Sequence, residues 1–101
     1  MDHIDNLAAL VAYDPDRRAS SLAFTADGVR AVVFAFAAGQ ELAEHRAPAP
    51  ILLQALEGEL RVAAQGREVV LRPGGILHLE SGVPHSVAAE VDGKLLLCIL
   101  R

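Results

Sequence analysis

Imidazole side chains are the groups of this chain best suited to chemistry. The chain has four histidines: His3 lies near the N-terminus, whereas His45, His78 and His85 lie in or beside apolar runs. A neutral imidazole offers one hydrogen-bond donor and one acceptor, and the acceptor nitrogen can also ligate a metal ion. The chemistry to consider is therefore hydrogen bonding to a polar ligand, proton transfer and metal ligation.

Several common catalytic patterns are absent from the sequence. It contains no CxxC pair, no HExxH motif and no serine nucleophile motif. Its glycines lack the strand-then-helix context of a phosphate-binding loop. Cys98 is the single cysteine, which excludes an internal disulfide, and we expect it to be a buried small hydrophobe within the terminal apolar run.

Composition predicts one compact domain and excludes two classes of partner. The chain has 101 residues, of which 52% are hydrophobic and 4% aromatic, and its net charge is −4. An acidic chain without a basic run is a poor electrostatic match for nucleic acid, and few aromatic side chains are available for base stacking. The sequence contains neither a signal peptide nor an apolar stretch of about 20 residues, so we expect no membrane contact and a cytoplasmic location.

The elements that must position the histidines are short strands. Near the N-terminus, Ile4, Leu7, Leu10 and Val11 have the spacing of one short amphipathic helix, which Asp2 or Asp5 could cap. From about residue 19, apolar runs alternate with turn residues, a pattern typical of an all-β sandwich or barrel. The runs are Ser21–Thr25, Val29–Phe36, Gln40–His45, Ile51–Leu56, Leu60–Ala64, Glu68–Leu71, Ile76–Leu79, His85–Ala89 and Lys94–Leu100.

We therefore predict an all-β fold, a single jelly-roll β-barrel with a short N-terminal helix. Residues 1–18 would form the helix and a linker, and residues 19–101 the barrel. The last run is apolar on both faces of a strand, so its outer face needs a cover. The N-terminal helix or a second subunit could provide it, and a homodimer is the expected assembly.

Two blocks of residues have a recognisable spacing. The first block is Gly39, His45, Ala47, Ile51 and Gly58, and the second is Gly74, Glu80, Gly82, His85 and Ala89. The blocks resemble the two motifs of small single-domain cupins (RmlC-like jelly rolls), which read Gly, His, His, Glu, Gly and Gly, Pro, Gly, His, Asn at these spacings. The resemblance covers about residue 19 to the C-terminus.

This resemblance implies a degenerate metal site. In metal-dependent cupins, the two histidines and the glutamate of the first motif and the histidine of the second hold a divalent ion. Here His45 and His85 match two of these four ligands, whereas Ala47 and Ile51 replace the others. Neither replacement can donate a lone pair to a metal. The cofactor is therefore unknown, a divalent transition metal on His45 and His85 being one alternative.

Three further residues could complete the site. His78 and Glu80 share one face of a strand, and Leu77 and Leu79 share the other. The leucines are the more natural barrel lining, which would send His78 and Glu80 outward, but the opposite phase would place both in the cavity. Gln54 interrupts an apolar run and needs a hydrogen-bond partner if it is buried. It could contact a ligand, or it could bond a neighbouring strand or lie at a subunit contact.

Three functions follow from these residues. The first is a small-molecule-binding cupin domain without the full metal-ligand set, in which His45, His85, Gln54 and His78 are the candidate binding residues. The second is a metal-dependent cupin enzyme, of dioxygenase or isomerase type, that uses His45, His85 and a substitute ligand. The third is a structural or regulatory homodimer with a vestigial cavity. In each case we expect no nucleic-acid partner.

Overall fold

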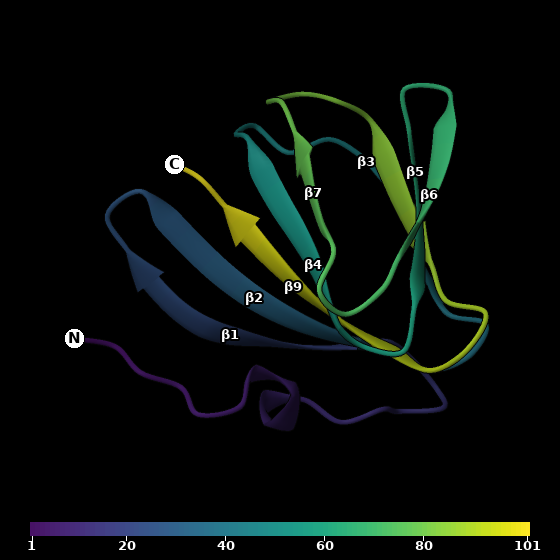
Figure 1. Ribbon diagram of the computed structural model, residues 1–101, viewed down its shortest axis with the longest axis horizontal. Coiled ribbons are helices and arrows are strands. Elements are labelled where there is room, and N and C mark those ends of the chain that lie inside the picture. The colour runs from purple at the N-terminus through teal and green to yellow at the C-terminus, as the bar shows by residue number, and fades with distance from the viewer.

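The computed structural model describes residues 1–101, which form two antiparallel sheets and one helical turn (Figure 1). The strand order is β1-β2-β9-β4-β7 in the five-stranded sheet and β3-β8-β5-β6 in the four-stranded sheet. The chain therefore crosses repeatedly between the sheets, as it does in a jelly roll. The strands are β1 (Ala19–Ala26), β2 (Val29–Phe36), β3 (Glu41–His45), β4 (Ile51–Glu57), β5 (Leu60–Ala64), β6 (Arg67–Leu71), β7 (Ile76–Leu79), β8 (His85–Ala88) and β9 (Gly93–Ile99).

The all-β jelly-roll prediction is confirmed, and each of the predicted apolar runs forms a strand with small differences at its ends. Turn residues separate the strands as expected. The turn between β4 and β5 shows why one glycine is needed: Gly58 has φ +65°, and a Cβ atom there would overlap the carbonyl oxygen of Asp92. Only glycine combines this backbone conformation with such a close approach.

The main core lies between the two sheets. Alternate residues of each strand face it, so β4 buries Ile51, Leu53 and Ala55 and leaves the residues between them only half-buried. Both sheets contribute to one cluster of buried side chains. The cluster contains Phe36, Ile51, Leu53, Ala55, Leu60, Val62, Leu71, Leu79, Val87, Ala89 and Leu95.

The N-terminal helix is shorter than predicted. It is a 3-10 helix, η1 (Leu7–Leu10), and Asn6 rather than Asp2 or Asp5 caps it by accepting a hydrogen bond from the Ala8 amide. A lone turn of this length cannot propagate an α-helix, so packing against the sheet holds it in place. No helix in the structure has both the length and the apolar character needed to span a membrane.

A second cluster shows what covers the outer face of the five-stranded sheet. Val11 packs there with Val33 and Ala35 of β2, and Leu96 of β9 packs against them. The N-terminal segment therefore covers part of the outer face of β9. It was one of the two covers that the sequence analysis proposed for this face, the other being a second subunit. Tyr13 ties this segment down, because its hydroxyl donates a 2.7 Å hydrogen bond to Glu57 of β4.

Candidate functional site

Pairing between β3 and β8 places His45 directly opposite His85. Leu42 is opposite Val87, and an irregularity between Leu42 and His45 gives β3 one extra residue relative to β8. Without that bulge, simple alternation would send Leu42 and His45 to opposite faces. With it, Leu42 packs against the main core and His45 still meets His85, which lies on the same inner face as Val87.

The two imidazole rings are in contact. Their centroids are 4.3 Å apart and the ring planes are tilted by 56°. His85 is only 2% exposed and is the one polar residue in the buried set, whereas His45 is half-buried. Two distant segments of the chain therefore build one imidazole pair at the inner face of the four-stranded sheet.

Hydrogen bonds determine which nitrogen of each ring is available. His45 Nδ1 lies 3.1 Å from the Ala43 carbonyl oxygen, and His85 Nδ1 lies 3.0 Å from the Val83 carbonyl oxygen. A carbonyl oxygen can only accept, so Nδ1 carries the proton in both rings. In the neutral state each Nε2 then has a free lone pair. No buried side-chain nitrogen or oxygen lacks a partner, so neither Nε2 atom is both fully buried and unpaired.

The residues around the pair do not complete a metal site of the usual kind. No group of three His, Cys, Asp or Glu side chains is placed to hold an ion. Ala47 packs against the main core, and Ile51 is 1% exposed within it, so the two replaced positions belong to the apolar interior. An ion bound here would have two protein ligands, whereas a catalytic zinc ion has three.

His78 does not join the pair. Leu77 and Leu79 face the core, and His78 and Glu80 are exposed, as the leucine phase of the strand predicts. His78 borders a small cavity of about 110 Å³ between β7 and the β5–β6 hairpin. That cavity includes neither His45 nor His85, so His78 lies outside the candidate site.

Gln54 also lies apart from the imidazole pair. It is half-buried and occupies the face of β4 opposite to Ile51 and Leu53, the outer face of the five-stranded sheet. Its strand neighbours are Leu96 on β9 and Ile76 on β7. No hydrogen bond from its side chain is present, so its position favours a surface or subunit contact over a barrel ligand.

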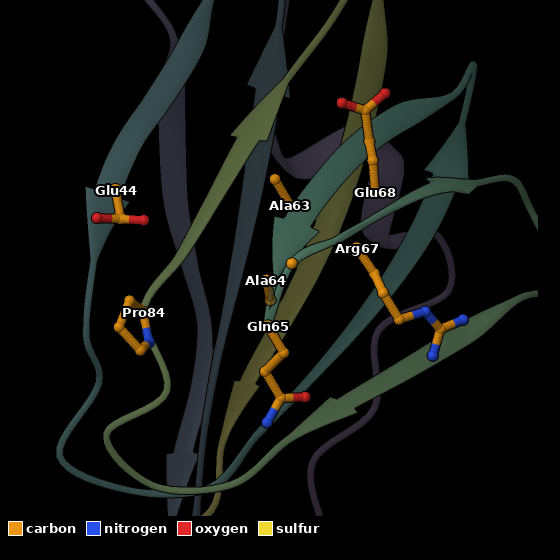
Figure 2. Close-up of a pocket in the computed structure, with 8 residues that line it drawn as sticks. Glu44, Ala63, Ala64, Gln65, Arg67, Glu68 and Pro84 are labelled. Carbon is orange, nitrogen blue, oxygen red and sulfur yellow. The ribbon is translucent and has the colours of Figure 1, made fainter.

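Two larger cavities lie elsewhere, and sequence reasoning singled out neither. One, of about 540 Å³, lies beside the β5–β6 turn and is bordered by Glu44 and Pro84, the chain neighbours of the paired histidines. Figure 2 shows that Glu44, Gln65, Arg67 and Glu68 are spread around this cavity without converging on one point. The other lies on β2 and β9 beside Arg30. A charged residue within the apolar run of β2 was the signal that could have revealed it.

Comparisons with known proteins support the jelly-roll fold. A cupin-domain family model matches residues 32–100. An RmlC-like cupin from Desulfovibrio desulfuricans is 30% identical, with a TM-score of 0.86 over 99% of this chain and 96% of that chain. A cupin superfamily protein from Desulfitobacterium hafniense has 23% identity and a TM-score of 0.88, covering 99% of this chain and 92% of that chain.

Enzymes also occur among the similar structures. A DMSP lyase from Ruegeria pomeroyi has 26% identity and a TM-score of 0.77, covering 85% of this chain and 48% of that chain. No curated protein sequence matches the chain. The family model spans most of the barrel, including both histidines of the pair. The chain therefore belongs to the cupin family.

Proposed function

We propose that the protein is a small-molecule-binding cupin in which the His45–His85 pair binds a polar group of the ligand. The contact between the two rings, with both Nδ1 atoms bonded to carbonyl oxygens, is the observation that carries the proposal. Two Nε2 lone pairs on one inner face form a matched pair of hydrogen-bond acceptors. A ligand with neighbouring O–H or N–H donors suits them.

The surroundings of the pair favour a ligand with an apolar body. Val87 lies beside His85 in the core, and Ala47 and Val83 pack against the same core. Binding sites for small molecules are mostly apolar with a few polar groups that orient the ligand. Neither imidazole contacts a carboxylate, so no orienting group of the kind that assists a general base is present. Binding is therefore proposed without catalysis.

A metal-dependent enzyme is the second candidate. The free Nε2 lone pairs favour it, because a histidine ligand commonly donates its other N–H to a backbone carbonyl. A water molecule or the substrate would have to supply the missing ligands. The structurally similar DMSP lyase shows only that the fold can carry an enzyme, since function depends on the site rather than the fold.

The third candidate is a structural or regulatory homodimer with a vestigial cavity. In that case the histidines would act as packing residues, and the low exposure of His85 is the observation that favours this role. The three candidates differ in what the histidine variants should do.

The test combines metal analysis with ligand binding. Protein purified without chelator or added metal is analysed for Fe, Mn, Ni, Zn and Cu, and a panel of small hydroxy, amino and amide compounds is screened by thermal shift. His45→Ala and His85→Ala are compared with His78→Ala, a matched control because His78 is an exposed histidine of the same chain. We expect less than about a tenth of an equivalent of each metal. A bound compound should lose affinity in the two pair variants alone.

Other results select the other candidates. Near-stoichiometric metal that is lost in His45→Ala and His85→Ala would establish the metal-dependent protein. Unchanged ligand binding together with a much lower unfolding temperature in both variants would assign the pair a structural role.

A further inference from the structure

The cavity beside Arg30 occupies the inner face of the five-stranded sheet, at the end that carries the β1–β2 hairpin. Its volume is about 540 Å³. Arg30 is opposite Ile99 and Val32 is opposite Leu97, so alternation places these side chains on one face of neighbouring strands. Phe34, on the same face of β2, packs against the main core, which identifies this face as the inner one.

The four-stranded sheet does not cover this end of the five-stranded sheet. Figure 1 shows the β1–β2 hairpin projecting away from β3, β5 and β6. Leu22, opposite Val32 on β1, is 51% exposed as a result. Along β2, the inner face therefore packs in the closed core near Phe34 and lines an open cavity near Arg30.

Polarity also changes along this cavity. Its polar end contains Arg30, Arg101 and Thr25, the last of which is directly opposite Arg30. Its apolar end contains Val32, Phe34 and Leu97. Arg30 and Phe34 lie on the same strand and face, so a ligand along β2 would meet the charge first and the aromatic ring further in.

The positive charge at the polar end is not neutralised by an ion pair with an acidic side chain of the protein. The only charged residues of the lining are Arg30 and Arg101. Arg61 and Arg72 each pair with glutamates, but neither Arg30 nor Arg101 makes an ion pair. Two unpaired guanidinium groups beside apolar surface, in a chain of net charge −4, form a local site for an anion.

We propose that this cavity binds an organic carboxylate with an apolar body. A guanidinium group matches a carboxylate through two parallel hydrogen bonds, and the Thr25 hydroxyl can add a third. The apolar body would lie on Val32, Phe34 and Leu97. The cavity volume is within the range of about 300–1,000 Å³ that is usual for small-molecule sites. His45 and His85 are not part of its lining, so this site does not depend on the function proposed for the pair.

The test uses three probes of equal chain length: octanoate, octan-1-ol and octyltrimethylammonium, measured by isothermal titration calorimetry. We also include 3-phenylpropionate, which distinguishes an aromatic from an alkyl body. Octanoate or 3-phenylpropionate should bind at least tenfold more tightly than the alcohol, and the cation should not bind. A tenfold difference corresponds to about 1.4 kcal/mol, close to the lower end of the range of about 1.5–3 kcal/mol for a hydrogen bond to a charged group.

Variants assign the binding to the cavity. Arg30→Gln should weaken carboxylate binding at least tenfold, and Arg30→Glu should abolish it. Arg17→Gln is the matched control, because Arg17 is also exposed and unpaired but lines no cavity, and it should bind as the wild type does. Arg30 is exposed, so these variants should keep the wild-type unfolding temperature.

Three outcomes would overturn the proposal. Equal affinity for octanoate and octan-1-ol would mean an apolar surface without anion selectivity. Loss of carboxylate binding in His85→Ala but not in Arg30→Gln would assign the acid to the imidazole pair instead. A dimer that becomes a monomer in Val32→Ser by sedimentation velocity would mean that a second copy of the chain fills the cavity.

Discussion

The properties of His45 and His85 depend on a contact that each ring makes with its own strand. Each Nδ1 lies close to the carbonyl oxygen two residues before it in the chain. The same local interaction occurs in both residues. In each neutral ring, Nδ1 is therefore protonated and Nε2 is the acceptor. The pair is therefore symmetric in hydrogen bonding, although His85 is more deeply buried.

The ring tautomer is directly testable at this scale. We expect both neutral rings to carry the proton on Nδ1, because only a donor can satisfy the carbonyl oxygens of Ala43 and Val83. Long-range ¹H–¹⁵N correlation spectra report which nitrogen is protonated. His78 serves as the internal control because it is exposed and makes no such bond. Protonation of Nε2 in either ring of the pair would contradict this expectation.

Cys98 is a second residue whose surroundings predict its chemistry. It is half-buried, and burial raises the pKa of its thiol above the usual value. The thiolate is the reactive form, so alkylation of the folded protein at pH 8.5 should be slower than alkylation of the urea-unfolded protein. Mass spectrometry after timed treatment with iodoacetamide measures the two rates. Equal rates would contradict the burial of the thiol.

At the scale of elements, the turns impose the strictest local demands. Gly58→Ala should cost more than about 3 kcal/mol of unfolding free energy, because the new Cβ would overlap the Asp92 carbonyl as well as strain the backbone. Gly28→Ala is the control: Gly28 has φ +86° but open space around it, so strain alone should cost about 1 kcal/mol. Urea unfolding of both variants measures the difference, and equal losses would rule out the clash.

Polar contacts to β4 and β9 help to hold the N-terminal segment. Tyr13 donates to Glu57, and Lys94 lies 3.4 Å from the same carboxylate and 5.1 Å from the centre of the Tyr13 ring. Lys94 also donates a 2.7 Å hydrogen bond to the Ala8 carbonyl oxygen. These contacts hold η1 and the residues after it on the outer face of the five-stranded sheet.

Removing the Tyr13 hydroxyl should destabilise this segment in a pH-dependent way. Tyr13→Phe should lower the unfolding free energy by about 1 kcal/mol at pH 8, where the phenol is protonated. Burial, and then the hydrogen bond and charge of Glu57, raise the pKa of Tyr13 above its ordinary value of 10.0. The unfolded chain therefore loses this proton first, and the stabilisation declines as the pH rises above about 10.

Urea unfolding of both proteins between pH 8 and pH 11 measures this effect. The difference between wild type and Tyr13→Phe should narrow as the pH rises. The two proteins differ only at residue 13, so the difference between their unfolding free energies reports on Tyr13. A difference that widens with pH would contradict the assignment.

At the scale of the whole molecule, the outer face of the five-stranded sheet is only partly covered. The N-terminal segment packs on Val33, Ala35 and Leu96, whereas Leu52 and Cys98 are half-buried and Ile76 is 59% exposed. Exposed apolar surface of this kind is where protein chains associate. A homodimer through this face therefore stays a prediction of the sequence.

Sedimentation velocity at micromolar concentration tests the dimer. The wild type should sediment as a dimer, and Ile76→Ser should shift it toward the monomer with little change in unfolding temperature, because Ile76 is exposed. Val91→Ser provides the control, since Val91 is an exposed hydrophobic residue outside the named strands. A wild-type monomer would end this prediction.

Sequence patterns predicted the strands well because each strand depends on local alternation and on the turns beside it. The sequence patterns were less successful where tertiary packing, rather than the local sequence, determines the conformation. The helical spacing from Ile4 to Val11 led to an amphipathic helix, but too few residues were available for more than one 3-10 turn. The sequence did not determine which face of β7 His78 occupies. In the structure Leu77 and Leu79 face the core, so His78 is exposed on the other face.

The sequence by itself determined the strand order along the chain, the cupin spacing and the loss of two metal ligands at Ala47 and Ile51. The strand order follows from local periodicity and turn residues, whereas the cupin spacing and the two missing ligands follow from the resemblance to the cupin motifs. Only the tertiary structure decided that His45 meets His85 in ring contact and that Arg30 opens onto an apolar cavity. The histidine contact depends on the bulge in β3, and the cavity depends on where the five-stranded sheet extends beyond the other, and both features arise from long-range pairing.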